Sequence, residues 1–325
     1  MIGGVRALVR AGVIRPMLPR PSLLGMVLEL PMLRPNLGLA VAFQAGTQPD
    51  AVAVIDDRGM LTWAELDNRV TRLANTLLQH GEPRGCVAFM VRNGREALEC
   101  YAAGGRSGLA PVPLNTWATG SEIGRILHMQ RPAVLVVDEE FTDAVAHAAS
   151  ASSSAPFVRG TGKVVIHTSG TTGSPKGAER SVGASGLGAM LGFVMKVPLQ
   201  RGDRLLIGPP LFHGFGGGVA GAAMLIGATS ILPRHFDPAD FQRIVDEHEV
   251  DAAALVPVQL RRALEEGGPG GPGRLRIILT SGSALPVALR QRAQQRWGEV
   301  TYDLYGSTEA GWVSISTPAD FRERR

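Results

Sequence analysis

The stretch VVIHTSGTTGSPKGAER, residues Val164 to Arg180, decides how this chain is expected to fold. Apolar and β-branched residues at 164–166 lead into Thr, Ser, Gly and Pro residues that surround one lysine, Lys176. This order predicts a buried strand followed by a loop. Glycines let the backbone approach a ligand closely, and hydroxyls, amides and an ammonium group suit phosphate oxygens. The sequence therefore predicts a phosphate-binding loop whose natural ligand is a nucleotide.

Two alternatives for this loop fit less well. A Walker A loop requires G-x-x-x-x-G-K-[ST], and counting from Gly170 places Pro175 where that motif needs glycine and Gly177 where it needs Ser or Thr. A flexible Gly/Ser linker would not follow a strand so closely. It would also not be expected to hold one of the only three lysines in the chain.

The totals describe an ordinary globular protein. The 325 residues suffice for about two domains, and 45% hydrophobic with 19% charged residues are typical of neither disordered nor membrane-spanning chains. The net charge of +4 is scattered, and no motif for nucleic-acid binding accompanies it, so we expect no nucleic-acid partner. Cys86 and Cys100 are too few for a disulfide framework or a zinc site. We interpret them as buried thiols in a reducing compartment.

Residues 1–45 are predicted to form a basic, apolar N-terminal arm. Arginines punctuate apolar runs over the first 35 residues, and prolines at 16, 19, 21 and 31 interrupt any signal peptide or membrane-spanning helix. The arm either packs on the body of the protein or lies on an anionic membrane surface. We therefore expect a cytoplasmic protein, with membrane association as the alternative.

From residue 46 onward, short β-branched runs alternate with helical periodicity. This alternation predicts an α/β fold with mostly parallel sheets flanked by helices. We expect a first α/β subdomain at 46–160 and a second at 161–325. The expected strands are 51–56, 86–91, 110–114, 133–137, 163–167, 203–208, 228–232, 252–256 and 275–280. The clearest helix is expected at 62–81, where Thr62 can cap the helix together with Glu65, and Gly81 can end it.

Five motifs, in the same order along the chain, resemble those of the adenylate-forming superfamily of acyl-CoA synthetases, peptide-synthetase adenylation domains and luciferases. They are TSGTTGSPKG (168–177), GLAPVPLNTWATGSEIGRIL (108–127), PPLFHGFGG (209–217), SGSALP (281–286) and YGSTEAG (305–311). The first matches the signature phosphate loop of the superfamily almost letter for letter. Together the motifs span most of the chain, and the N-terminal arm resembles that of bacterial fatty acyl-CoA ligases.

The resemblance implies ATP-dependent activation of a carboxylic acid to acyl-AMP and then to acyl-CoA, with Mg²⁺ and with coenzyme A as co-substrate. It implies that Thr172 and Glu309 help hold Mg²⁺, that Lys176 covers the β- and γ-phosphates, and that His213 lies at the carboxylate end of the acyl pocket. The implied nucleotide-binding residues are Thr168, Ser169, Gly170, Thr171, Gly173, Lys176, Gly282, Ser283, Ala284, Tyr305, Gly306 and Thr308.

The run GFGGGVAGAAMLIGA at 214–228 contains six glycines, so its helix propensity is poor. A glycine-lined wall would leave an apolar tunnel, which favours a fatty acyl substrate. The alternative is close packing of a helix on a sheet, which glycine also permits. Activation of an amino acid is less expected, because no aspartate occurs between 214 and 233 to meet an ammonium group.

The chain ends soon after Glu309, whereas the superfamily continues through the rest of a β-barrel subdomain to a mobile C-terminal domain that carries a lysine needed for adenylation. We therefore expect the N-terminal portion of an acid–thiol ligase, impaired as this chain, with a possible partner covering the open face. The alternative is a non-catalytic remnant or a nucleotide- or acyl-binding module.

Overall fold

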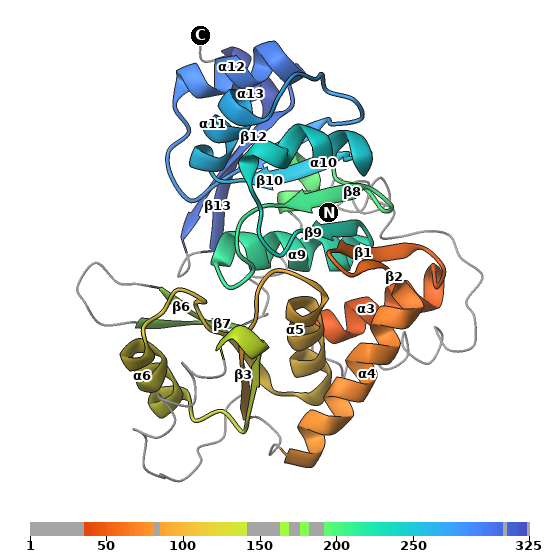
Figure 1. The fold of residues 1–325 in the computed structure, drawn as a ribbon, viewed down its shortest axis with the longest axis vertical. Coiled ribbons are helices and arrows are strands. Elements are labelled where there is room, and N and C mark those ends of the chain that lie inside the picture. The colour runs from red at the N-terminus through yellow and green to blue at the C-terminus, as the bar shows by residue number, and fades with distance from the viewer. Residues whose placement is uncertain are drawn as a thin grey trace.

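The fold was analysed in a computed structural model that describes residues 36–80, 85–141, 192–307 and 311–323, together with the backbone of 163–168 and 176–181. Figure 1 shows the large sheet with helices α10 to α13 in the upper part and helices α4 to α6 with strand β3 in the lower part. The described helices are α3 (Leu37–Thr47), α4 (Trp63–His80), α5 (Arg95–Ser107), α6 (Gly120–Gln130), α9 (Gly214–Ile226), α10 (Phe241–Glu247), α11 (Pro257–Glu266), α12 (Val287–Trp297) and α13 (Pro318–Glu323).

The large sheet has the strand order β13-β12-β11-β10-β8-β9-β1-β2. All neighbours from β12 to β1 run parallel, and the two edge strands, β13 and β2, run antiparallel. The strands are β1 (Val52–Asp56), β2 (Gly59–Thr62), β8 (Arg204–Ile207), β9 (Thr229–Leu232), β10 (Ala252–Leu255), β11 (Ile277–Thr280), β12 (Thr301–Ser307) and β13 (Gly311–Ser316). The predicted α/β class with a mainly parallel sheet is confirmed.

Two smaller sheets complete the described fold. One has the parallel order β4-β3-β5, from β3 (Cys86–Met90), β4 (Ala110–Pro113) and β5 (Val134–Val137). The other pairs β6 (Lys163–Thr168) with β7 (Lys176–Ser181). Strands β1 and β2 lie in the range predicted as the first subdomain but join the large sheet through β9, so the sheets do not follow the division of the chain at 160. That division stays a prediction.

Helix α4 begins as the sequence predicts. The Thr62 amide and hydroxyl both donate to Glu65 Oε2, at 2.8 and 2.9 Å, and the Glu65 amide donates back to the Thr62 hydroxyl at 3.3 Å. This reciprocal capping satisfies backbone groups that the first turn leaves without partners. The helix buries Trp63, Leu66 and Val70 at helical spacing. Gly81, predicted to end it, lies outside the described residues.

Helix α9 corrects the expectation drawn from its glycines. Residues 214–226 form a helix in spite of their poor propensity, and most of its side chains are buried. A Cβ added at Gly216 would lie 2.3 Å from the carbonyl oxygen of Pro210, and one at Gly217 would lie 2.7 Å from that of Leu211. These glycines therefore permit close packing, here of the helix on the loop at 209–211 and not on a sheet as the alternative to a tunnel wall supposed. Burial outweighs intrinsic propensity here.

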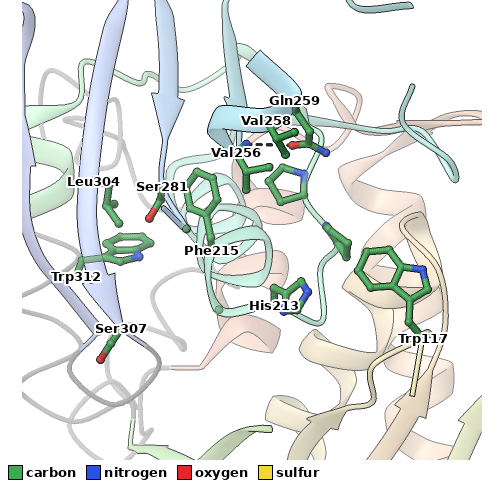
Figure 2. Close-up of a pocket in the computed structure, with 16 residues that line it drawn as sticks. Trp117, His213, Phe215, Val256, Val258, Gln259, Ser281, Leu304, Ser307 and Trp312 are labelled. Carbon is green, nitrogen blue, oxygen red and sulfur yellow. Dashed lines mark hydrogen bonds between the residues drawn. The ribbon is translucent and has the colours of Figure 1, made fainter. Parts of the chain in front are cut away.

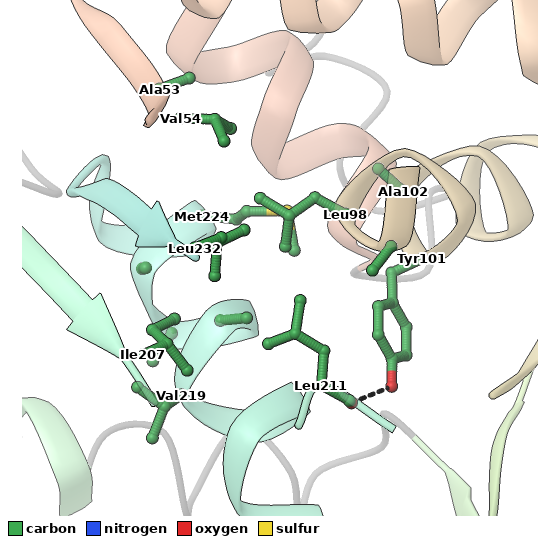
Figure 3. Close-up of a cluster of buried hydrophobic side chains, with 14 of the residues drawn as sticks. Ala53, Val54, Leu98, Tyr101, Ala102, Ile207, Leu211, Val219, Met224 and Leu232 are labelled. Carbon is green, nitrogen blue, oxygen red and sulfur yellow. Dashed lines mark hydrogen bonds between the residues drawn. The ribbon is translucent and has the colours of Figure 1, made fainter. Parts of the chain in front are cut away.

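Apolar layers cover both faces of the large sheet. Leu206, Leu255 and Ile278 face α10, α11 and α12, whereas their strand neighbours belong to the cluster that includes α4, α5 and α9. Figure 3 shows part of the second cluster, in which Tyr101 donates a hydrogen bond of 2.8 Å to the carbonyl oxygen of Leu211. This bond fixes the segment between β8 and α9 against α5.

The described end of the predicted N-terminal arm packs on the body. Gln44 of α3 is fully buried and its amide donates to the carbonyl oxygen of Leu225 at 2.9 Å. Residues 1–35, on which the membrane alternative rests, lie outside the described residues. Among the described helices, none combines the length and apolar character needed to span a membrane.

Candidate functional site

A cavity of about 570 Å³ lies where the parallel strands of the large sheet end. Its walls follow β8 at Pro209 and Pro210, β10 at Val256, and β11 at Ser281 and Gly282. Figure 2 shows Val256 and Ser281 from these strand ends, with Trp312 and Trp117 on opposite sides of the view and Phe215 and His213 between them. Ligands of open α/β sheets bind outside the carboxyl ends of the strands. The topology therefore makes this cavity the candidate site.

His213 lines the cavity as the N-cap residue of α9. Its ring lies 4.4 Å from the Phe212 ring and 6.2 Å from the Trp117 ring, measured between centroids. His213 remains exposed toward the cavity, but partial desolvation beside these apolar groups lowers its pKa below the ordinary value of 6.5. The imidazole is therefore neutral at pH 7 and offers one hydrogen-bond donor and one acceptor to the cavity.

The loop that carries His213 is held on both sides. Asn93 donates to the carbonyl oxygen of Pro209 at 3.1 Å and accepts from the Leu211 amide at 2.9 Å. Gln259 of α11 accepts from the Val256 amide and donates to the carbonyl oxygen of Gly208, both at 3.0 Å. These bonds tie the ends of β8 and β10 together, so the cavity has a rigid floor.

Of the three residues predicted for the adenine-side turn, only Gly282 lines the cavity. Gly282 lines it with a φ of 92°, a conformation that favours glycine, and an added Cβ would lie 3.3 Å from Val256. Ser283 and Ala284 are exposed beside the turn and are not among the cavity-lining residues.

The end of β12 supplies the opposite wall. Gly306 lines the cavity at an irregularity in the β12–β13 pairing, where an added Cβ would lie 2.3 Å from the carbonyl oxygen of Gly311. Tyr305 is 68% exposed and is not a lining residue. Its predicted place beside adenine stays a prediction.

The two ends of the predicted phosphate loop, Thr168 and Lys176, lie in strands β6 and β7. Thr168 and Lys176 are register partners at the ends of β6 and β7, so residues 169–175 connect the two strands. The predicted site residues that lie outside the described residues are Ser169, Gly170, Thr171, Thr172, Gly173, Thr308 and Glu309. The backbone of Thr168 and Lys176 belongs to the described residues, whereas their side chains lie outside them.

The predicted Mg²⁺ ligands, Thr172 and Glu309, are both among those residues. The described residues contain no cluster of three or more His, Cys, Asp or Glu side chains that could hold a metal ion. A hydroxyl and a carboxylate fit Mg²⁺ in donor chemistry, because this ion takes oxygen ligands and is completed by water and substrate phosphates.

A model of the AMP-binding enzyme family matches residues 41–325. The chain belongs to this family. Indoleacetate–CoA ligase of Aromatoleum aromaticum is 30% identical over 315 residues, covering 86% of this chain and 61% of that protein. The chain thus spans less than two thirds of the length of this relative.

Solved structures support the fold assignment. The N-terminal domain of the protein FACL13 from Mycobacterium tuberculosis superposes with a TM-score of 0.76 at 22% identity, covering 89% of this chain and 80% of that one. O-succinylbenzoate coenzyme A synthetase from Bacillus subtilis, in complex with AMP, gives a TM-score of 0.72 at 24% identity, covering 88% and 78%. At these identities the likeness establishes the fold of this chain.

Sequence analysis missed two residues that line the cavity at the strand ends, Trp312 and Trp117. Trp312 packs on Phe193 with ring centroids 4.8 Å apart, and an added Cβ at Gly218 would lie 3.0 Å from the Trp312 ring. Trp117 is 65% exposed at the cavity rim. Both tryptophans lie inside or next to quoted motifs, and tryptophan is scarce in this chain, which was the signal available.

Proposed function

We propose that this chain takes part in the ATP-dependent activation of a carboxylic acid. In the first step, a carboxylate oxygen of the acid forms a bond to the α-phosphorus of ATP, and pyrophosphate leaves with the bridging oxygen. In the second, the thiol of coenzyme A forms a thioester and AMP leaves. The single observation that carries this proposal is the cavity at the strand ends, where the Gly282 turn, Gly306 and His213 meet.

The residues that line the cavity offer groups for both parts of an acyl adenylate. Gly282 and Gly306 line the cavity without side chains, which suits a flat base, while neutral His213 can donate a hydrogen bond to a carboxylate oxygen. We infer that Lys176 and the loop at 169–175 meet the phosphates, and that Thr172 and Glu309 hold Mg²⁺, which would offset phosphate charge.

We infer that the acid has an apolar body, because Phe215, Leu304 and Trp312 line the cavity beyond His213. A fatty acid belongs to this class and stays the prediction from sequence, although the α9 glycines no longer support it. Trp312 covers Gly218 and bounds the space available to the acid. We therefore expect Trp312 to limit the length of the acid.

Acid-dependent release of pyrophosphate from Mg-ATP tests this proposal with a series of straight-chain acids. In the wild-type chain, each additional methylene that the cavity buries should raise kcat/KM by an amount equivalent to about 0.8 kcal/mol. This gain should end abruptly at the acid length that fills the cavity. Trp312→Ala should move this limit to longer acids, because it removes the ring over Gly218.

The matched control is Val313→Ala, because Val313 is the next residue on β13 and is 59% exposed. This variant should keep the wild-type limit. Lys176→Ala should abolish release in either background. A folded wild-type chain that binds an acyl-adenylate analogue but releases no pyrophosphate would contradict activation by this chain alone, and would agree with the expected impairment or with the binding-module alternative.

A further inference from the structure

Asn93 joins the smaller parallel sheet to the loop that carries His213. It lies between β3 and α5, whereas residues 209–211 follow β8 of the large sheet. The side-chain nitrogen of Asn93 donates to the carbonyl oxygen of Pro209 at 3.1 Å, and its side-chain oxygen accepts from the Leu211 amide at 2.9 Å. The two ends of one side chain therefore hold one short backbone segment of the other sheet.

The two partners of Asn93 demand an amide side chain. The carbonyl oxygen of Pro209 can only accept a hydrogen bond, and the N–H of Leu211 can only donate one. The side chain that meets both must offer a donor and an acceptor at a fixed spacing. An ionised aspartate would offer no donor, and an alanine would offer neither group, so either substitution frees the segment at 209–211.

Asn93 is itself held in place on both sides. The Arg92 amide donates to Asp138 Oδ2 at 2.9 Å, directly after β5. The Arg95 amide donates to Asp56 Oδ2 at 3.1 Å, at the end of β1. Because the backbone on either side of Asn93 is bound to a strand end, the position of Asn93 is passed on to residues 209–211.

A second group from the same part of the chain holds Leu211. The hydroxyl of Tyr101 in α5 donates to the Leu211 carbonyl oxygen at 2.8 Å (Figure 3). Asn93 thus binds the N–H of Leu211, and Tyr101 binds its C=O. Tyr101 is only 4% exposed, so without this hydroxyl the carbonyl group would be left buried and unsatisfied.

The imidazole of His213 depends on this backbone for its position. It makes no capping hydrogen bond to α9, and the contacts described for it are with the Phe212 and Trp117 rings. The His213 amide donates to the carbonyl oxygen of Pro210 at 3.1 Å, which ties the residue to the segment that Asn93 holds. The backbone at 209–211 therefore decides where the imidazole lies in the cavity.

We propose that Asn93 is a positioning residue for the acid, because it sets the His213 imidazole against the carboxyl group through the backbone at 209–211. This inference rests on the proposed function. Asn93 is not among the described residues that line the cavity at the strand ends, so it acts through the loop and not on the ligand. The smaller sheet thereby takes part in recognition of the acid.

A double-mutant cycle between Asn93 and His213 tests the proposal through the affinity for an acyl-adenylate analogue. His213→Ala should weaken binding by about tenfold, the ratio that one hydrogen bond of ordinary strength gives. Asn93→Ala should cost a similar factor in the wild-type background and less than about twofold in the His213→Ala background. The affinity for AMP, which has no acyl group, should stay unchanged in Asn93→Ala.

The matched control is Asn36→Ala. Asn36 also uses its side chain to hold a backbone amide, since its oxygen accepts from the Leu39 amide at 3.0 Å at the start of α3. Loss of this cap should lower the melting temperature and leave the affinity for the analogue unchanged. The control therefore separates a loss of stability from a loss of position.

Tyr101→Phe is the second variant, and it decides the question if Asn93→Ala does not fold. It removes only the hydroxyl that binds Leu211, and it should lower the affinity for the analogue only where His213 is present. The ring resonances of His213, identified by their loss in His213→Ala, give a readout without ligand. Both variants should shift these resonances, and Asn36→Ala should not.

Three results would contradict these claims, each in a different way. If Asn93→Ala costs the same factor with and without His213, its role is structural and the positioning role is wrong, while the proposed function stands. If Asn93→Ala and Tyr101→Phe leave the His213 resonances unmoved, the positioning role is wrong as well. If the folded wild-type chain binds no analogue, the proposed function fails, and the resonances still show whether Asn93 positions the ring.

Discussion

Asp56→Ala is expected to lower the free energy of unfolding by about 3–5 kcal/mol, because it leaves the guanidinium of Arg95 buried without its partner. The side chains of Asp56 and Arg95 are only 4% and 10% exposed. Arg95 Nε donates to Asp56 Oδ2 at 2.8 Å, and Arg95 Nη2 donates to Oδ1 at 2.5 Å and to the carbonyl oxygen of Gly59 at 2.9 Å. This pair joins β1 and β2 to α5.

Asp56, at the end of β1, also caps the N-terminus of helix α5. The N-cap residue, Gly94, has no side chain, and the Arg95 amide donates to Asp56 Oδ2 at 3.1 Å instead. Chemical denaturation at pH 7 measures the loss. The matched control is Asp240→Ala, because its pair with Arg243 is exposed on both sides. This control should leave the midpoint unchanged, and an equal loss in both variants would contradict the account.

The pKa of Asp56 also predicts how the free energy of unfolding changes at acid pH. Burial raises the pKa of Asp56, but hydrogen bonds from the Arg95 side chain and from the Arg95 and Arg58 amides outweigh it, so the pKa lies below its ordinary value of 3.8. The folded state therefore binds this proton less readily than the unfolded state. The stabilisation is complete above that value and is lost as the pH falls through the lower folded pKa. Asp56→Asn should remove this part of the pH dependence.

Gly216→Ala is expected to have the second large effect, on ligand binding. The added Cβ would lie 2.3 Å from the carbonyl oxygen of Pro210 and 2.9 Å from that of Pro209, and neither backbone atom can yield as a flexible side chain would. The loop that carries His213 must shift. We expect the affinity for an acyl-adenylate analogue to fall by about a hundredfold, taking as the scale the loss of rate that a misplacement of about 1 Å can cause at a positioned site.

Gly221→Ala in the same helix is the control for Gly216→Ala. Its Cβ would make ordinary contacts with Leu37 at 3.6 and 3.8 Å, and alanine has a higher helix propensity than glycine by about 1 kcal/mol. This variant should bind the analogue like the wild type and melt at an equal or higher temperature. A similar loss of affinity in both variants would mean that the loop position does not govern the site.

Much of the fold follows from local pattern. The strand ranges predicted at 203–208, 228–232 and 252–256 agree within two residues with β8, β9 and β10, because each is a short apolar run in a βα alternation. The glycine-rich helix α9 could not be foreseen, since its stability comes from tertiary packing, including contacts with α3, which is distant in the sequence. The pairing of β1 with β9 likewise depends on contacts that no local window contains.

The sequence predicted some residues of the candidate site and missed others, and the difference has a physical cause. His213, Gly282 and Gly306 lie in motifs with recognisable order, and the structure brings all three to one cavity. Trp312 and Trp117 escaped notice, because their importance arises from the ring contacts they make with Phe193 and Phe212. The roles predicted for Thr172, Lys176 and Glu309 stay predictions.

Isothermal titration of the purified chain with a non-hydrolysable acyl-adenylate analogue tests the central claim most directly, after a cooperative melt has shown that the chain is folded. The account predicts one analogue per chain, bound more tightly than AMP or the acid alone, with the affinity lost in Gly216→Ala and retained in Gly221→Ala. A folded chain that takes up no analogue would contradict the assignment of the cavity at the strand ends as the acyl-adenylate site.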